Sequence, residues 1–274
     1  MAVICISREL AANGEETARE LAEVGGYRFI ERRDIETELA RHNISSTTLL
    51  QYDEKKPGFW AALSENRDRY VHYLMESICS EAARGNCIIL GRGASAVLQD
   101  VPGVIGVRIV APRQERLQRL KTRANCDARS AEQQLKQSDH NRQGFHKYFF
   151  DVDWQDPSQY HLTVNTGKMN ARQAARVIEE YRQIMVSPET EAEGKIRLEE
   201  LRLRNVIIGE IIFTRHIQIQ ELAVTVKGPE VTLTGCAISK IAAANAEEAA
   251  RGIAGVGTVV NSIMVIPPAP VVTN

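Results

Sequence analysis

Apolar residues come in short continuous runs through the first two-thirds of the chain. Residues 2–6, 87–90 and 104–110 form three such runs, and residues 160–164 form a weaker fourth. A run that is apolar at every position, rather than at every second one, is typical of a strand buried on both faces. Amphipathic helical stretches separate the runs, near residues 15–24, 33–42, 67–84, 112–123, 130–147 and 170–185. This alternation predicts an α/β domain with a parallel sheet covered by helices on both faces.

The pattern changes at residues 187–194, which are acidic, nearly free of apolar side chains and contain both proline and glycine. We interpret this stretch as an interdomain linker. The domain that precedes it then spans residues 1–186.

A different order of elements follows. The pattern predicts a helix over 195–213, a hairpin of two alternating strands, an alanine-rich helix over 238–252 and a last strand over 259–266. The hairpin strands are 217–226, with a slip near Glu221, and 231–235. These elements predict a small α+β domain over 195–267 with the order α-β-β-α-β. The tail, 268–274, is expected to leave the fold, with polyproline II conformation over 267–270.

Composition narrows the function classes. The 274 residues include 34 Lys+Arg against 35 Asp+Glu, a net charge of −1, and 5% are aromatic. Near-neutral charge argues against a nucleic-acid coat protein or a polybasic membrane binder, and few aromatics argue against a stacking platform for single strands. We therefore expect no nucleic-acid partner.

Compartment is predicted from the cysteines and the N-terminus. The five cysteines are scattered and form no C-x-x-C pair, which is typical of reduced thiols inside the cell. The first residues lack the basic region and apolar run of a signal peptide, and no stretch approaches the ~20 apolar residues of a membrane span. The expected location is the cytoplasm.

The first candidate site follows the strand at 2–6, where the chain turns into a helix. A strand–helix turn of this kind is where backbone amides and the helix dipole receive a phosphate. Against the pattern G-x-x-x-x-G-K-[ST], only Gly14 fits, because Glu9 and Glu15 occupy the positions of the first glycine and the lysine. The residues alone leave open an ordinary turn, with Glu15 and Glu16 as partners of the helix dipole. The candidate phosphate-loop residues are Ser7, Arg8, Asn13, Gly14, Glu15 and Thr17.

The second candidate is the sequence Gly91-Arg92-Gly93, which ends the strand at 87–90. Guanidinium groups suit bidentate contact with phosphate, and flanking glycines let a ligand approach the backbone. The alternative is an arginine exposed in a glycine turn.

A basic region forms the third candidate. Residues 108–129 contain seven basic and two acidic side chains, and Arg116, Arg119 and Arg123 share one helix face. Asp139 and Arg142 follow on the next helix at i, i+3, a spacing that suits a local ion pair. The region is either a clamp for polyphosphate or a solvated face.

Together these motifs resemble the cytidylate kinase-like family, a branch of the nucleoside monophosphate kinases. The resemblance covers about residues 1–185 in the family's order. It rests on I-S-R-E-x(4)-G at 6–14, Y-R-F-I-E-R-R at 27–33, I-L-G-R-G-A at 89–94, the stretch 101–120, D-H-N-R at 139–142 and D-P-S-Q-Y-H-L-T-V-N-T at 156–166.

The resemblance implies a P-loop fold and transfer of the γ-phosphoryl group of ATP, with Mg²⁺, to a nucleoside monophosphate such as CMP. It implies nucleotide-binding roles for Arg32, Gly91, Arg92, Gly93 and Asp139. It implies catalytic roles on the lid side of the site for Arg116, Arg119 and Arg142.

The chain departs from the family in its phosphate loop, which is usually close to G-S-G-G followed by a basic residue. Here Ala11-Ala12-Asn13-Gly14 is followed by Glu15, whose charge repels a triphosphate, and Arg8, Thr17 and Arg19 are the candidates to compensate. Gly93 also replaces an aspartate of the cytidylate kinases proper, so cytosine preference does not carry over. Two functions stay open: a nucleotide kinase, or a catalytically degenerate kinase-like domain that acts as a nucleotide sensor or interaction protein.

Residues 195–267 resemble a BON domain, through the stretches 224–237 and 255–265 and the alanine-rich helix between them. Related modules are thought to contact membranes or ligands, so the resemblance implies such a contact. The lack of an export signal and the nearly balanced charge of this domain argue against lipid binding.

Overall fold

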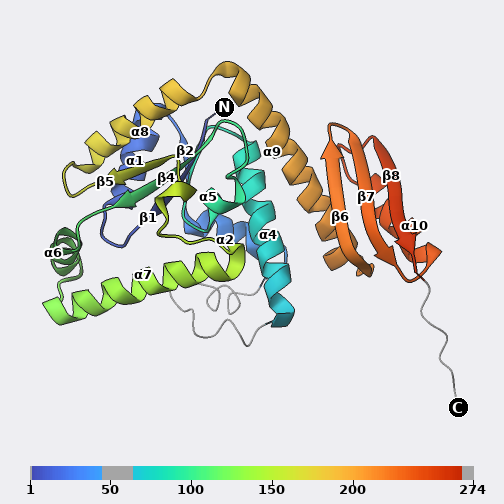
Figure 1. The fold of residues 1–274 in the computed structure, drawn as a ribbon, viewed down its shortest axis with the longest axis horizontal. Helices are drawn as coiled ribbons and strands as arrows, with labels where there is room; N and C mark the ends of the chain where they lie inside the picture. The colour runs from blue at the N-terminus through green and yellow to red at the C-terminus, as the bar shows by residue number, and fades with distance from the viewer. Residues whose placement is uncertain (1, 45–63, 267–274) are drawn as a thin grey trace, which may run out of the picture. The chain divides into compact units, whose positions relative to one another are not determined.

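The computed structural model describes residues 2–44 and 64–266 of the chain (Figure 1). The chain divides into two compact units, Met1–Lys195 and Ile196–Asn274. The predicted tail, 268–274, and the predicted polyproline II segment, 267–270, lie outside the described residues.

The first unit contains a five-stranded parallel sheet in the order β2-β3-β1-β4-β5. Its strands are β1 (Val3–Arg8), β2 (Arg28–Ile30), β3 (Cys87–Leu90), β4 (Val104–Val110) and β5 (Leu162–Asn165). Its helices are α1 (Gly14–Gly25), α2 (Arg32–Arg41), α4 (Ser64–Ala83), α5 (Ala94–Val97), α6 (Arg113–Ala124), α7 (Ala128–Phe150), α8 (Ala171–Met185) and the start of α9 (Pro188–Ile208). The predicted parallel α/β domain is confirmed.

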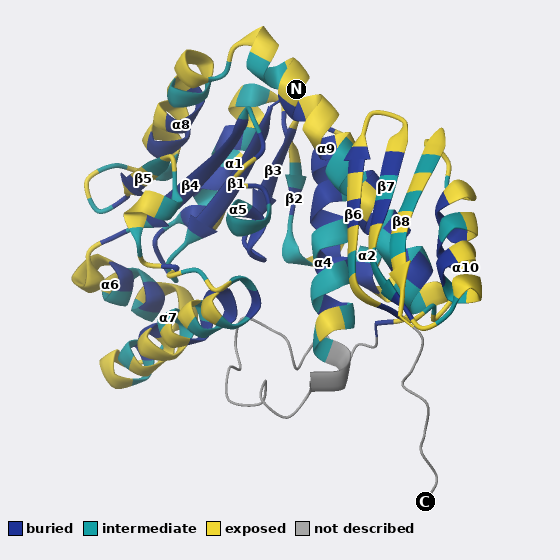
Figure 2. Ribbon diagram, turned by 45° about the vertical axis from the view of Figure 1, so that its right-hand side comes forward, coloured by how far each residue is buried: buried dark blue, intermediate teal, exposed yellow. Residues whose placement is uncertain are grey.

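Side chains of β1 enter the packing on both faces of this sheet. Ile4 and Ile6 belong to the apolar core that also contains Leu21 of α1 and Ile178 of α8. On the other face Cys5 lies near Cys79 of α4, and burial, with the neighbouring thiols, raises the pKa of Cys5. Figure 2 shows the resulting buried strands between exposed helix surfaces. Continuous apolar runs in the sequence therefore correspond to strands with two covered faces.

Strand β2 was absent from the sequence prediction. It has three residues, begins with an exposed Arg28, and lies at the edge of the sheet beside β3. A strand this short, with one charged residue, has no apolar run to reveal it.

Residues 188–194 of the predicted linker form the first turns of α9, and the chain divides into its two units directly after them, between Lys195 and Ile196. Pro188 is the first residue of this helix and Glu189 and Glu191 lie in its first turn, positions where proline and acidic residues favour a helix start. The helix also packs closely on its own unit. A Cβ atom built on Gly194 would lie 2.0 Å from the carbonyl oxygen of Pro102, so glycine permits this approach. We expect the two units to fold independently of each other.

The second unit contains the end of α9, the π-helical segment Gly209–Thr214, β6 (Ile219–Lys227), β7 (Glu230–Ala237), α10 (Lys240–Arg251) and β8 (Thr258–Val265). Its sheet has the order β6-β7-β8, with β7 antiparallel to β6 and parallel to β8. The predicted α-β-β-α-β order is confirmed. The predicted slip is a shift of register between Gln220 and Ala223, where Glu221 has a φ of 50°.

Within the described residues, we find no helix with the length and apolar character that crossing a membrane requires.

Candidate active site

The loop between β1 and α1 adopts backbone conformations that normally require glycine. Ala11 and Asn13 have φ angles of 60° and 56°, in the left-handed region. An L-residue with a Cβ atom pays about 1–2 kcal/mol for this conformation. The alanine at position 11 therefore does not prevent the left-handed geometry expected of a glycine-rich loop.

Four successive carbonyl groups of this loop, those of residues 10–13, accept hydrogen bonds from side chains at 2.7–3.4 Å. The donors, in the same order, are Arg116, Arg119, Thr166 and Thr17. Carbonyl and amide groups point in opposite directions across a planar trans peptide. The amides of the same four peptides, those of residues 11–14, therefore point away from the four donors, and that of Ala12 donates to the carbonyl oxygen of Glu9 at 3.3 Å.

Glu9 anchors the loop to the strand behind it. Its carboxylate accepts a hydrogen bond from the backbone amide of Ala111 at 3.2 Å and forms ion pairs with Arg116 at 3.3 Å and Arg108 at 3.6 Å. In the sequence, Glu9 is only a mismatch to the first glycine of the phosphate-loop pattern. In the structure its charge is used to fix two arginines.

Arg116 and Arg119 are engaged with the loop itself. The Arg116 side chain is 6% exposed and forms two hydrogen bonds with the Asp139 carboxylate, at 2.7 and 3.0 Å. Arg119 also donates to the carbonyl oxygen of Thr166 at 2.7 Å. The alternative of a solvated face is therefore wrong for Arg116. These contacts favour a positioning role, and a catalytic role for either arginine stays a prediction.

The predicted ion pair between Asp139 and Arg142 is not formed, because Asp139 pairs with Arg116 instead. Packing of α6 against α7 brings Arg116 to the Asp139 carboxylate, whereas Arg142 donates to the hydroxyl of Ser138 at 2.8 Å. A partner from another helix has replaced the neighbour at i, i+3.

The Ser7 hydroxyl contacts the aromatic residues Trp154 and Tyr160. The indole of Trp154 donates to the Ser7 hydroxyl at 2.7 Å, and the Tyr160 hydroxyl lies 3.3 Å from the same oxygen. Arg108 stacks on Trp154 with its guanidinium carbon 4.1 Å from the ring centre. This buried group supports the end of β1.

In front of the loop lies a cavity of about 590 Å³, between the carboxyl ends of β1 and β3 and helices α6 and α7. Five arginines and two glutamates line it: Arg8, Arg19, Arg32, Arg92, Arg142, Glu15 and Glu31. The polar side chains of α7 that also line it are Gln134, Gln137, Ser138 and Asn141. The excess of positive charge in a concave site at the sheet edge suits a phosphorylated ligand.

Arg92 is held in this cavity by an unusual backbone and a shared carboxylate. Gly91, Arg92 and Gly93 have consecutive positive φ angles of 77°, 57° and 74°, and Arg92 is 2% exposed. Its guanidinium donates to Glu36, which also accepts from Arg32 at 2.6 Å. Glu36 thus fixes two cavity arginines together. Sequence reasoning missed this residue, and the i, i+4 spacing from Arg32 is the signal that could have found it.

Gly93 has no room for a side chain. A Cβ atom built there would lie 2.1 Å from the ring of Phe150, and the φ of 74° disfavours any L-residue. An aspartate at this position, as the cytidylate kinases proper are expected to have, would require the ring to move.

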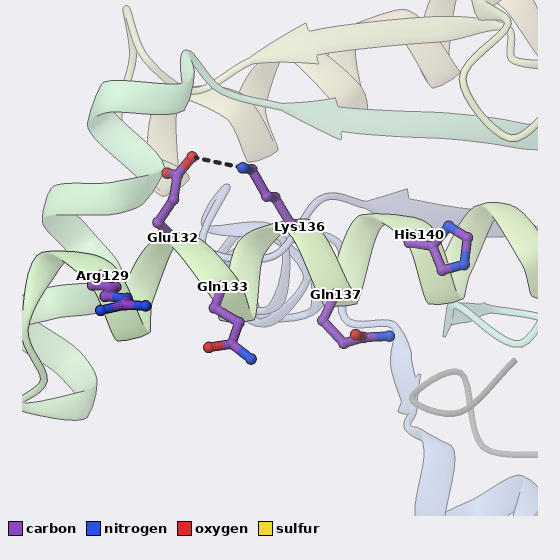
Figure 3. Close-up of a pocket in the computed structure, with 6 residues that line it drawn as sticks. All are labelled: Arg129, Glu132, Gln133, Lys136, Gln137 and His140. Carbon is purple, nitrogen blue, oxygen red and sulfur yellow. Dashed lines mark ion pairs between the residues drawn. The ribbon is translucent and has the colours of Figure 1, made fainter. Parts of the chain in front are cut away.

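A second hollow, of about 460 Å³, lies along one face of α7 (Figure 3). The side chains that line it are Arg129, Glu132, Gln133, Lys136, Gln137 and His140. They come from successive turns of one helix, and Glu132 and Lys136 pair with each other at 3.9 Å. A groove along a single helix brings no groups together from different elements, and we do not assign a site to it.

The residues at the loop do not form a dedicated Mg²⁺ site. The Thr17 hydroxyl, fully buried, donates to the Asn13 carbonyl, and Glu31 pairs with Arg19. Among residues 2–44 and 64–266 no cluster of three His, Cys, Asp or Glu side chains has metal-binding geometry. We derive no step from a protein-bound metal ion.

Comparison with known proteins adds to this geometry. The pattern of the cytidylate kinase-like family matches residues 3–168, more than half of the chain. The chain belongs to the cytidylate kinase-like family. The BON domain pattern matches residues 201–267, so the predicted fusion is confirmed. Membrane or ligand contact through the BON domain stays a prediction.

Solved structures resemble the kinase-like unit at low sequence identity. An uncharacterized protein from Eubacterium ventriosum is 20% identical, with a TM-score of 0.54, over 67% of this chain and 99% of that chain. A shikimate kinase from Acinetobacter baumannii, in complex with shikimate, is 17% identical, with a TM-score of 0.39, over 67% and 94% of the two chains. A sugar kinase from Janibacter is 15% identical, with a TM-score of 0.43, over 69% and 98%. No curated protein matches the chain.

For this member of the cytidylate kinase-like family, the predicted site residues fall into two groups. Arg8, Glu15, Arg32, Arg92 and Arg142 line one cavity. The others lie around it: Asn13 and Gly14 start α1, Gly91 and Gly93 flank Arg92, and Ser7, Thr17, Arg116, Arg119 and Asp139 support the loop.

The left-handed conformation of Ala11 gives a stability prediction. Ala11→Gly removes about 1–2 kcal/mol of backbone strain, which offsets the lost methyl group and the greater freedom of glycine in the unfolded chain. Ala12→Gly, at a fully buried neighbour without positive φ, has no such compensation. We expect Ala11→Gly to be near neutral and Ala12→Gly to cost about 1–2 kcal/mol in urea unfolding. Equal losses in the two variants would contradict this account of the loop.

Proposed function

We propose that the protein binds a nucleoside monophosphate, such as CMP, in the arginine-lined cavity and transfers the γ-phosphoryl group of ATP to it. The observation that carries this proposal is Arg92, which lines the same cavity as the start of α1 and is fixed with Arg32 by Glu36. A donor phosphate at the loop and an acceptor phosphate at Arg92 would then occupy one cavity. Positioning and charge neutralisation are the main requirements of phosphoryl transfer.

Each residue has a distinct part in this proposal. Arg92 and Arg32 bind the monophosphate, while the loop amides face the phosphates of ATP. Arg116 and Arg119 hold the loop carbonyls and so keep the amides oriented. Arg142, which also lines the cavity, supplies positive charge from the side of α7.

A second candidate function is nucleotide sensing without efficient catalysis. Glu15 stands where the family carries a cation, and its side chain is 56% exposed at the edge of the cavity. A negative charge at that position weakens triphosphate binding and leaves charge on the transferred group without a partner.

An ADP-release assay distinguishes the two functions. With ATP and CMP, dCMP or UMP, we expect ADP release that depends on the monophosphate but is slower than the roughly 1–100 s⁻¹ of ordinary kinases. Monophosphate binding without any dependent ADP release would favour the sensor. Neither binding nor ADP release with any of the three would contradict both functions.

A further inference from the structure

The side chain of Arg8 crosses the first residue of α1. A Cβ atom built on Gly14 would lie 2.5 Å from Cβ and 2.6 Å from Cγ of Arg8, so the arginine stem lies directly over the glycine. Gly14 does not have a positive φ. The requirement for glycine at this position is therefore space for Arg8, and not a special backbone conformation.

The guanidinium of Arg8 reaches the cavity beside the N-terminus of α1. Arg8 and Glu15 both line the cavity, and Nη2 of Arg8 lies 3.9 Å from Oε1 of Glu15. The Arg8 side chain is 14% exposed, whereas that of Glu15 is 56% exposed. The separation of 3.9 Å is an ion pair that is longer than a charge-assisted hydrogen bond.

Other arginines near the loop are engaged in different directions. Arg19 pairs with Glu31 and stacks on Phe29, and its side chain is 61% exposed. Arg123 pairs with Glu16. Arg116 and Arg119 hold carbonyl groups of the loop.

We infer that Arg8 supplies the positive charge that this phosphate loop lacks at position 15, and that it binds the β- and γ-phosphates of a nucleoside triphosphate. This inference rests on the proposed function and specifies its triphosphate side. The cation comes from the end of β1 instead of from the first turn of α1, and Gly14 leaves room for it. Glu15, 3.9 Å away, offsets part of its charge. The loop thereby combines an acidic helix start with binding of an anionic ligand.

Calorimetric titrations of ATP and of CMP, each alone, test the inference on the full chain. Arg8→Gln keeps most of the aliphatic stem but removes the charge, and we expect ATP affinity to fall about tenfold to a hundredfold. CMP affinity is expected to stay within about twofold, because Arg92 and Arg32 bind the monophosphate. Arg8→Lys is expected to recover part of the ATP affinity. The control is Arg176→Gln, an exposed arginine of α8, which is expected to change neither titration.

Gly14→Ala provides a second, independent variant. Its methyl group displaces the stem of Arg8, so ATP affinity is expected to fall while CMP affinity stays. Circular dichroism melting shows whether each variant is folded. If Gly14→Ala does not fold, the Arg8→Gln titration alone tests the inference.

Unchanged ATP affinity in Arg8→Gln, or equal losses of ATP and CMP, would overturn the inference. So would a wild-type protein that binds CMP but not ATP, although monophosphate binding would then still stand. A wild-type protein that binds neither nucleotide would overturn the proposed function and this inference with it.

Discussion

Glu15→Arg is expected to raise the rate of phosphoryl transfer from ATP to CMP at least tenfold. Two unit charges ~4 Å apart interact by about 4 kcal/mol at an effective dielectric of 20. Glu15 is partly exposed, so we retain about a third of this repulsion, which corresponds to roughly a tenfold change in ATP affinity. The new arginine also adds a second cation beside Arg8, and a single cation on the transferred phosphoryl group can contribute about 10³–10⁵ in rate.

The measurement is the ADP-release assay with wild type, Glu15→Arg and a matched control. Glu23→Arg makes the same change of charge on an exposed side chain of α1, about two turns further along the helix, and is expected to leave the rate near that of wild type. A wild-type rate already within 1–100 s⁻¹ would show that Glu15 does not impair the loop. An unchanged rate in Glu15→Arg would show that the negative charge of Glu15 is not the cause of slow turnover.

Arg92→Ala is expected to weaken CMP binding about tenfold to a hundredfold. A charge-assisted hydrogen bond to phosphate is worth about 1.5–3 kcal/mol, and this arginine is held in place by Glu36. Glu36 keeps Arg32 as a partner in the variant, so the expected loss of melting temperature is small.

Calorimetric titration of CMP measures this effect, with melting temperature as the second readout. Arg176→Ala, on the exposed side of α8, removes the same charge away from the cavity and is expected to bind CMP normally. Normal CMP affinity in Arg92→Ala would exclude this arginine from the site. A large fall in melting temperature would instead assign it a structural role.

Local sequence patterns predicted the central elements of the fold, because doubly buried strands leave continuous apolar runs. They did not predict β2, whose three residues include an exposed arginine. They also did not predict a helix at residues 188–194, although Pro188 and the following acidic residues favour a helix start. The close approach of Gly194 to Pro102 depends on tertiary packing, which no local pattern reports.

In the candidate site, too, local sequence patterns predict some features, whereas others depend on tertiary packing. Strand ends in a parallel sheet meet at one edge, so Arg8 and Arg92 could be predicted to lie near one cavity. Their partners could not, since Glu36 reaches Arg92 across 56 positions of sequence. The sequence left Arg116 as part of either a polyphosphate clamp or a solvated face, and in the structure Glu9 and Asp139 bind it. Which arginine faces a ligand and which holds a loop is decided by carboxylates that are distant in sequence.

A crystal structure of the protein with CMP tests most directly whether the arginine-lined cavity binds a nucleoside monophosphate. We predict that the phosphate group lies within hydrogen-bond distance of Arg92 and Arg32, with the nucleoside in the cavity beside α7. A CMP phosphate bound elsewhere on the protein, or a cavity without CMP at millimolar concentrations of the nucleotide, would contradict the account.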